Sequence, residues 1–365
     1  MLGTDAALLV ICANRPDYLR RALDAVRAHH PGLGGAPPGS PGSIPVVISQ
    51  DGVSLGVERV IQDFKRDMNG RAAVVHIRHH QEARLARENN YVKLAAHFKF
   101  ALDQAFNELH QDGYEFALVD KVIVLEEDLE IGESPRQHPT PDFFEYMSAT
   151  APLLDRDDSL MAISAWNDNG MHAHVKDPEV LYRSDFFPGL GWMLPRRVWD
   201  ELSPKWPKGY WDDWLREPGQ RQSRQFIRPE VCRTFHFGQK GTSNNQYSRY
   251  LNDIRLSQEK VAFRSFDLSY LSPERYEADL LRRLGAARAV SVAEAKGAGG
   301  QQRRPGEELR VPYKGNAGFE RAARQLGIMD NIKAGVPRTA YKGVVTFWLG
   351  GVRVHLFPES LLRPP

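Results

Sequence analysis

The sequence predicts an α/β fold with a mostly parallel sheet flanked by helices, followed by a smaller C-terminal α+β domain. Two observations indicate this. Through the first half of the 365-residue chain, short apolar runs alternate with stretches whose apolar residues recur at helical spacing. Such alternation is typical of parallel strands, because each helix carries the chain back across the sheet. Beyond Phe237 the chain turns polar and rich in Gly, and the alternation ends.

The elements of the first part follow in order along the chain. Apolar runs predict strands at 7–13, 44–52, 72–80 and 121–131. Helical spacing of apolar residues predicts helices at 15–30, 57–68 and 90–109. Between the first helix and the second strand, Gly and Pro are so frequent that no regular structure is expected.

The C-terminal part is expected to form a separate, smaller unit. Residues 238–252 are polar and rich in Gly and Asn, which is typical of a loop. A helix is predicted at 318–328, and 343–357 reads as two strands around Gly350 and Gly351, a typical hairpin sequence. We therefore expect one domain at 1–238 and a smaller one at 273–365. A loop and linker at 239–272 connect them.

Composition excludes several classes of protein. The formal net charge is only +2, with acidic and basic residues mixed along the chain, so no nucleic-acid partner is expected. Two cysteines, Cys12 and Cys232, are too few for a disulfide framework or a cysteine-based metal site. No apolar run reaches the length of about 18 residues that a membrane span needs, so no span is predicted.

Polar side chains gather where the predicted strands end. Asn14 and Arg15 follow the first strand, Asp51 ends the second, and the acidic triplet 126–128 lies near the end of the fourth. In open parallel sheets, ligands bind beyond the carboxyl ends of the strands. This edge of the sheet is therefore the predicted functional site.

The acidic triplet suits a metal ion. In an extended segment side chains alternate between faces, so Glu126 and Asp128 are expected on one face and Glu127 on the other. Two acids at a strand end suit a hard cation such as Mg²⁺ or Mn²⁺, which takes oxygen ligands and leaves positions open for substrate phosphates. The alternative is a solvated acidic turn without a ligand.

A second acidic pair, Asp212 and Asp213, lies among three tryptophans and a tyrosine in "PKWPKGYWDDWLREP" (204–218). Aromatic rings beside carboxylates are a recurrent way to hold a sugar, and an apolar wall makes a carboxylate a better base. The alternative is an aromatic core segment with an exposed acid pair. Together, the two acidic sites favour a metal-dependent enzyme that transfers a sugar from a nucleotide by single displacement, with inversion.

Several longer motifs carry a specific resemblance. They are "ISAWNDNG" (163–170), "LYRSDFFPGLGWML" (181–194), "PKWPKGYWDDW" (204–214), "IRPEVCRTFHFGQKG" (227–241), "DLSYL" (267–271) and "GVPRTAYKGVVTF" (335–347). With these motifs the chain resembles the N-acetylglucosaminyltransferase I family (glycosyltransferase family 13), from about Leu9 to Leu356.

The resemblance implies a GT-A nucleotide-sugar transferase fold with UDP-GlcNAc as the donor. It implies Mn²⁺ as the cofactor, with Mg²⁺ as the second candidate. The implied reaction is an inverting transfer of GlcNAc, in β-1,2 linkage, to the α-1,3-linked mannose of a high-mannose N-glycan on a glycoprotein. The implied location is the Golgi lumen.

The same resemblance implies a role for each acid of the triplet. Asp128 matches the family's metal ligand, Glu127 matches the acid near the ribose, and Glu126 matches the acid that faces the donor GlcNAc. The family has Asp at the middle position, so Glu127 is a departure. It keeps the charge but is one methylene longer.

Further positions match the family's donor and sugar sites. At the nucleotide end the matching residues are Arg15, Asp51 and His97. At the sugar end Leu190 and Trp211 line the site, Asp212 is the general base, and Ser243 belongs to the loop that closes over the donor. For His97 the alternative is a histidine on a helix face that packs against the sheet.

Two other functions stay open. The segments "LEEDLEI" and "NRPDYL" resemble the sister enzymes that add GlcNAc in β-1,2 linkage to protein O-linked mannose. A different class is a carbohydrate-binding protein that keeps the site but has lost catalysis. The presence of both Asp128 and Asp212 argues against that class.

Overall fold

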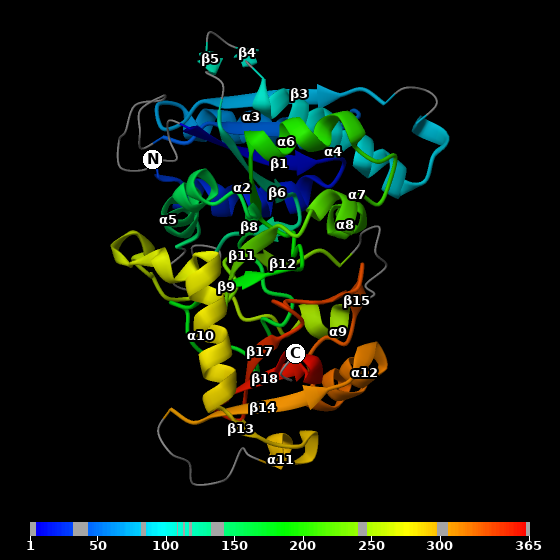
Figure 1. The fold of residues 1–365 in the computed structure, drawn as a ribbon. Coiled ribbons are helices and arrows are strands. Elements are labelled where there is room, and N and C mark those ends of the chain that lie inside the picture. Colours follow the sequence, from blue (N-terminus) through cyan, green and yellow to red (C-terminus); the bar gives the residue numbers. More distant parts are fainter. Residues whose placement is uncertain are drawn as a thin grey trace.

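In the computed structural model, two sheets of unequal size are stacked end to end (Figure 1). The larger sheet belongs to the N-terminal part of the chain, and the smaller one to the C-terminal part, with helix α10 (Pro273–Ala286) running beside the junction. The residues described are 5–31, 43–81, 85–107, 109–111, 114–116, 119–132, 142–239, 247–297 and 306–362.

Among these residues, the large sheet has eight strands in the order β3-β2-β1-β6-β10-β8-β11-β9. Strand β10 is antiparallel to both of its neighbours and β9 is antiparallel to β11, while the other neighbouring pairs are parallel. The predicted α/β fold with a mostly parallel sheet is therefore confirmed, and it agrees with the GT-A fold that the resemblance implies. The strands are β1 (Ala6–Cys12), β2 (Val46–Asp51), β3 (Val74–His79), β6 (Lys121–Glu126), β8 (Leu160–Ser164), β9 (Leu181–Ser184), β10 (Trp192–Pro195) and β11 (Gln225–Pro229).

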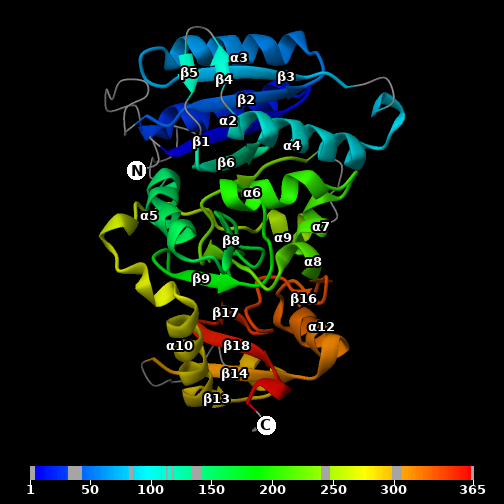
Figure 2. The same cartoon turned by 45° about the horizontal axis from the view of Figure 1, so that its top comes forward.

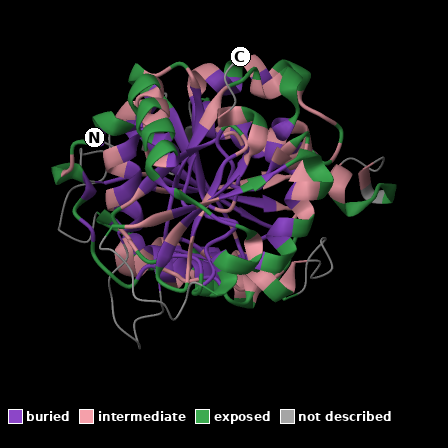
Figure 3. Ribbon diagram, turned by 60° about the horizontal axis from the view of Figure 1, so that its bottom comes forward, coloured by how far each residue is buried: buried purple, intermediate pink, exposed green. Residues whose placement is uncertain are grey.

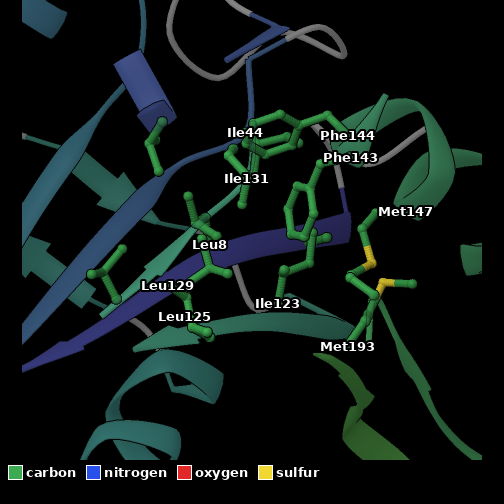
Figure 4. Packing of buried hydrophobic residues seen from close by; sticks show 14 of the residues in the cluster. Leu8, Ile44, Ile123, Leu125, Leu129, Ile131, Phe143, Phe144, Met147 and Met193 are labelled. Atoms are coloured by element: carbon green, nitrogen blue, oxygen red, sulfur yellow. The ribbon is translucent and has the colours of Figure 1, made fainter. Parts of the chain in front are cut away.

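Helices cover both faces of this sheet, because its central strands are apolar on both sides. Along β1, Leu8 and Val10 face α2, α3 and α5, while Leu9 and Ile11 face α4, α6 and α7. Figure 3 shows the buried residues concentrated in the interior. Figure 4 shows Leu8 and Ile123 packed near Phe143 of α5. The helices of this part are α2 (Pro16–His29), α3 (Leu55–Met68), α4 (Asn90–Phe106), α5 (Phe143–Arg156), α6 (Arg196–Leu202), α7 (Trp211–Arg216), α8 (Pro218–Arg221) and α9 (Ser248–Leu251).

Side-chain caps start two of these helices: α3 begins at Leu55, two residues before its predicted start, and α4 begins at Asn90 as predicted. The side chain of Ser54 accepts a hydrogen bond from the Val57 amide at the start of α3, and that of Asn89 accepts one from the Val92 amide at the start of α4. Each cap satisfies a backbone N–H group that the helix itself leaves without a partner. Helix α4 ends at Phe106, three residues before the predicted end. Short 3-10 helices lie at Leu85–Arg87, Ser203–Lys205, Phe263–Ser265, Leu268–Leu271 and Glu359–Leu362.

The C-terminal part has its own sheet and its own apolar core. Its strands, in spatial order, are β13 (Arg288–Ala289), β14 (Glu308–Tyr313), β18 (Val352–Pro358) and β17 (Val345–Leu349). Gly350 and Gly351 have φ of 56° and 82° at the turn between β17 and β18, so the predicted hairpin is confirmed. The helices here are α11 (Val292–Gly297) and α12 (Gly315–Leu326), and a second hairpin pairs β15 (Ile332–Lys333) with β16 (Val336–Pro337).

The strand predicted at 121–131 is wrong in one respect, because it is two strands. Strand β6 ends at Glu126, a turn covers Glu127 and Asp128, and β7 (Leu129–Glu130) then pairs with β12 (Phe235–His236). The only other short pair in the described part of this domain is β4 (Leu109–Gln111) with β5 (Tyr114–Phe116). None of the helices in the described ranges has both the length and the apolar character needed to cross a bilayer.

Candidate active site

A cavity of ≈ 940 Å³ opens at the carboxyl ends of β1, β2 and β6. Nine of the ten predicted site residues line it: Arg15, Asp51, His97, Glu126, Glu127, Asp128, Leu190, Trp211 and Asp212. The tenth, Ser243, lies outside the described residues. The acidic triplet and the tryptophan-flanked Asp212 therefore open into one space. In the sequence, Asp128 and Asp212 are 84 residues apart.

A larger hollow of ≈ 1300 Å³ lies elsewhere, beside α5 and the start of α10. It is bordered by residues such as Phe144, Phe266 and Arg275, and by none of the predicted site residues. Size alone therefore does not identify the functional site. The acids that converge at the strand ends identify the functional site, because the chemistry of a site depends on its polar groups.

Arg15 holds two acids of the triplet together. Its Nε donates to Glu127 Oε1 at 2.6 Å, and its Nη2 donates to Asp128 Oδ2 at 3.0 Å. The amide of Ala13 donates to the other oxygen of Glu127 at 3.2 Å. The expectation that Glu127 points away from Asp128 is therefore wrong, because the two residues lie in a turn and the alternation of a strand does not apply there.

Glu126 lies among negative charges without an ion-pair partner in the described residues. Burial, then repulsion from Asp128 and from Asp212, raises the pKa of Glu126 to about 8, although Arg15 acts in the opposite direction. Burial also holds the pKa of Glu127 above its ordinary value, partly offset by Arg15. At neutral pH the Glu126 carboxyl is therefore largely protonated, and a cation bound beside it would favour its ionised form.

The strand pair of β7 with β12 brings a second segment against Asp128. The amide of Phe237 donates to the Asp128 carbonyl at 3.0 Å, and Nε2 of His236 lies 3.7 Å from Asp128 Oδ2. Both His236 and Gly238 line the cavity. Asp128 is only 9% exposed, so its carboxylate is presented to the cavity and not to bulk solvent.

The residues around Asp128 fit a divalent cation that a substrate helps to bind. Among the described residues, no cluster of three or more His, Cys, Asp and Glu side chains could hold a metal ion alone. Mg²⁺ and related hard cations usually take one or two carboxylates and complete their coordination with water and substrate phosphates. Asp128, with the carboxyl of Glu126 nearby, provides this kind of oxygen donor set.

A row of polar side chains lies at the other end of the cavity. Asp51, at the end of β2, accepts from Nδ1 of His79 at 2.7 Å and from Gln81 at 2.5 Å. Burial would raise the pKa of Asp51, but these hydrogen bonds and the nearby imidazoles outweigh it, and the pKa lies below its ordinary value. Asp51 is therefore an anionic acceptor that suits hydroxyl and N–H groups of a ligand.

His97 packs against the sheet, as its alternative description predicts, and also reaches the cavity. It lies on α4, is 2% exposed, and its Nε2 is 2.8 Å from Oγ of Ser49 on β2. Its ring stacks on His79 with centroids 5.5 Å apart. Burial lowers the pKa of His97 to about 4, so the ring is neutral at physiological pH. It packs against the sheet and also lines the cavity.

A strained turn carries Leu190. Gly189, Leu190 and Gly191 have φ of 69°, 51° and 85°, and a leucine in this left-handed region is uncommon. Hydrogen bonds fix the turn, because the Ser164 hydroxyl donates to the Gly189 carbonyl and the Thr234 hydroxyl donates to the Leu190 carbonyl, each at 2.7 Å. The fold thus holds the Leu190 side chain at the cavity wall at some conformational cost.

Trp211 belongs mainly to the core. Its ring lies 4.3 Å from that of Phe98 and 5.8 Å from that of Trp192, centroid to centroid, and the residue is 6% exposed. Tyr210, the residue before it, has a φ of 52° and stacks on Tyr91 at 4.3 Å. Tyr210 and Trp211 both line the cavity, so the aromatic segment is partly core and partly cavity wall.

Asp212 lies in the first turn of α7, next to a buried arginine. Nη1 of Arg216 donates to Asp212 Oδ2 and to Asp213 Oδ1, each at 2.8 Å. The side chain of Asp212 is 45% exposed and lines the cavity, whereas Asp213 does not line it. Asp212 is thus the acid of this pair that a ligand can reach.

Sequence reasoning missed the residues that the C-terminal part of the chain contributes to the cavity. Arg338 lines the cavity, pairs with the buried Asp168, and donates to Asn331 at 3.0 Å. Asn169 accepts from the Met329 amide at 2.9 Å, which links the segment after β8 to the C-terminal part of the chain. Asp168 and Asn169 lie in "ISAWNDNG" and Arg338 lies in "GVPRTAYKG". Both motifs carry the family resemblance, but no site role was predicted for these three residues.

Known proteins resemble this chain over nearly its whole length. The sequence matches the GNT-I family over residues 3–363. It is 41% identical over 366 residues to the alpha-1,3-mannosyl-glycoprotein 2-beta-N-acetylglucosaminyltransferase of Arabidopsis thaliana, over 98% of this chain and 75% of that relative.

Solved structures give only weak likenesses. Mannosyltransferase PcManGT from Pyrobaculum calidifontis, in complex with GDP-Man and Mn²⁺, is 14% identical with a TM-score of 0.38, over 62% of this chain and 55% of that one. Mouse xyloside xylosyltransferase 1 is 15% identical with a TM-score of 0.29, over 60% and 73%. At such scores neither likeness carries an argument about this chain.

Proposed function

The chain belongs to the GNT-I family of glycosyltransferases, and from this premise we propose that it transfers GlcNAc from UDP-GlcNAc to a mannose. The linkage is β-1,2, the reaction proceeds with inversion, and the acceptor is the α-1,3-linked mannose of a high-mannose N-glycan on a glycoprotein. The observation that carries the proposal is that Asp128 and Asp212 open into the same cavity, since the reaction needs both ends of the donor in one space.

The nucleotide end of the donor lies, in this proposal, along β1, β2 and α4. Asp51 accepts hydrogen bonds from the nucleotide, and the neutral ring of His97 packs beside it. Glu127, held by Arg15 at 2.6 Å, lies near the ribose, and Glu126 faces the GlcNAc ring. Leu190 and Trp211 supply the apolar wall against which the sugar rests.

Asp212 takes the proton of the acceptor. The acceptor oxygen forms a bond to the anomeric carbon of GlcNAc, and the bond from that carbon to the diphosphate oxygen breaks. The electron pair of the broken bond leaves with UDP, and the proton of the acceptor hydroxyl passes to a carboxylate oxygen of Asp212. Attack from the face opposite the leaving group inverts the anomeric centre.

Asp128 is the residue that would hold a divalent cation, Mn²⁺ in our proposal and Mg²⁺ as the second candidate. Such a cation, when bound, would neutralise the charge that develops on the diphosphate. The protein contributes a buried carboxylate whose position is fixed by the backbone bond from Phe237. Arg15 orients this carboxylate, because its Nη2 donates to Oδ2 of Asp128 at 3.0 Å.

An acceptor competition tests the proposed function. Purified protein receives UDP-GlcNAc and Mn²⁺ with an equimolar mixture of a five-mannose N-glycan and an O-mannosyl peptide, and mass spectrometry follows both products. We expect GlcNAc on the N-glycan only, and no product in a parallel reaction with a chelator. Transfer to the peptide alone would assign the protein to the O-mannose enzymes instead.

The same reaction distinguishes catalysis from binding alone. A carbohydrate-binding protein without catalysis would release no UDP, even with Mn²⁺ and acceptor present. UDP release that depends on the N-glycan would exclude that class. Because the proposed substrate is a maturing N-glycan, we expect the protein in the Golgi lumen, and imaging of the tagged protein in its native cell would test this.

A further inference from the structure

A lysine of the C-terminal domain reaches the acid pair at the start of α7. Nζ of Lys333, on β15, donates to Oδ2 of Asp213 at 2.9 Å. The other oxygen of Asp213 accepts from Arg216 Nη1 at 2.8 Å, and the same nitrogen donates to Asp212 at 2.8 Å. A continuous row of charge-assisted hydrogen bonds thus runs from the small domain to the cavity.

Further contacts fix two members of this row, Arg216 and the backbone of Lys333. Arg216 is 7% exposed, its Nε donates to the Phe187 carbonyl at 3.1 Å, and its guanidinium carbon lies 4.8 Å from the centroid of the Phe186 ring. Figure 2 shows α7 and α8 above the hairpin that holds β16. In that hairpin Lys333 pairs with Val336 across a two-residue turn, so its backbone is fixed as well.

Charge also ties Lys333 to this acid pair. Burial alone would raise the pKa of Asp213, but the hydrogen bond from Lys333 and the charge of Arg216 outweigh it, and the pKa lies below its ordinary value. Asp212 also faces Glu126 across the cavity. Lys333 itself does not line the cavity, so it acts on a ligand only through its neighbours.

We propose that Lys333 is a positioning residue, which holds Asp213 so that Arg216 stays between the two acids and keeps Asp212 directed into the cavity. This inference rests on the proposed function, because it takes Asp212 as the base. Without Lys333, the carboxylate of Asp213 loses one of its two cations and competes with Asp212 for Arg216. Asp212 then loses its fixed orientation, and turnover falls while donor binding is kept.

Kinetics of Lys333→Met test this, because the change removes the charge and keeps the length of the side chain. We expect kcat to fall about tenfold, with the KM for UDP-GlcNAc within about twofold of wild type. The acid limb of the kcat–pH profile should move to higher pH, because a positive charge near the carboxylates is gone. Lys333→Arg should restore most of kcat, because it restores a cationic donor.

Two further variants complete the experiment. Asp213→Asn breaks the same contact from its other side, so kcat should fall as in Lys333→Met, but the acid limb should move to lower pH because a negative charge is gone. Lys342→Met is the matched control, since Lys342 pairs with Glu277 outside the cavity and its loss should change neither kcat nor the pH profile.

The outcomes separate the inference from the function on which it rests. Wild-type kcat and an unmoved pH profile in both Lys333→Met and Asp213→Asn would overturn the positioning role. The proposed function would still stand if Asp212→Asn were inactive in the same assays. Normal turnover in Asp212→Asn would overturn both the base and the role of Lys333.

Discussion

Gly238 leaves no room for a side chain beside the carboxylate of Asp128. A Cβ at position 238 would lie 2.8 Å from Oδ2 of Asp128 and 2.9 Å from its Cβ, closer than real Cβ contacts come. The neighbouring amide of Phe237 bonds to the Asp128 backbone, so the two segments cannot separate without losing a hydrogen bond. Glycine is needed here because two chain segments approach closely at the proposed metal ligand.

Gly238→Ala should therefore displace the Asp128 carboxylate. We expect turnover to fall by about 10²-fold, because misplacing a reacting group by about 1 Å has that effect. Steady-state kinetics at saturating Mn²⁺ measure it, and the thermal midpoint should change little. Gly219→Ala is the control, since a Cβ there meets nothing within 4 Å. Wild-type kcat in Gly238→Ala would show that the position of Asp128 does not matter.

Metal and nucleotide together should stabilise the protein through Asp128. A ligand at 100 times its Kd stabilises the folded state by about 2.7 kcal/mol, so Mn²⁺ with UDP should raise the Tm of the wild type, and EDTA should reverse the rise. Asp128→Asn removes the charge with little change of size and should abolish the rise. Differential scanning fluorimetry measures the change in Tm. An equal rise in Tm in this variant would show that Asp128 is not the metal ligand.

Asp212→Asn should separate donor binding from turnover. The amide cannot accept the proton of the acceptor, so kcat should fall by about 10²- to 10⁴-fold. The affinity for UDP-GlcNAc, measured by calorimetry with Mn²⁺, should stay close to that of the wild type, because the proposed donor contacts lie elsewhere in the cavity. Turnover within a few-fold of wild type would assign the base to another residue.

His97 should make the folded state less stable as the pH falls. Burial lowers its pKa to about 4, while in the unfolded chain it binds a proton near its ordinary value of about 6.5. The stability that the neutral His97 ring contributes to the folded state is thus fully present above pH 6.5. Between pH 6.5 and 4 the unfolded state binds more protons, so up to about 1.4 kcal/mol of stability is lost for each pH unit.

His97→Gln removes this titration and keeps a hydrogen-bonding group near Ser49. Urea unfolding of both proteins between pH 7 and 4.5 should therefore show a smaller loss of stability in the variant. Burial also lowers the pKa of His30 and of His76, and both contribute equally to the two curves. Parallel curves would mean that folding does not lower the pKa of His97.

Local periodicity, which decides whether a segment forms a strand or a helix, predicted four of the eight strands of the large sheet: β1, β2, β3 and β6. No strand was predicted at β8, β9, β10 or β11. The predicted strands at 7–13, 44–52 and 72–80 overlap β1, β2 and β3, and the hairpin at Gly350 follows from its turn residues. The fourth strand was predicted one segment too long. Its break at Glu127 depends on the pairing of β7 with β12, which lies about 100 residues further along the chain.

The sequence by itself determined the chemical types at the site and one of its edges. Because the carboxyl ends of parallel strands meet, Arg15, Asp51 and the acidic triplet had to lie near one another. Only the tertiary structure decided which acids touch, how far each is buried, and that a lysine of another domain supports Asp213. Burial and long-range contacts depend on how distant segments pack, and a local pattern of residues does not contain that information.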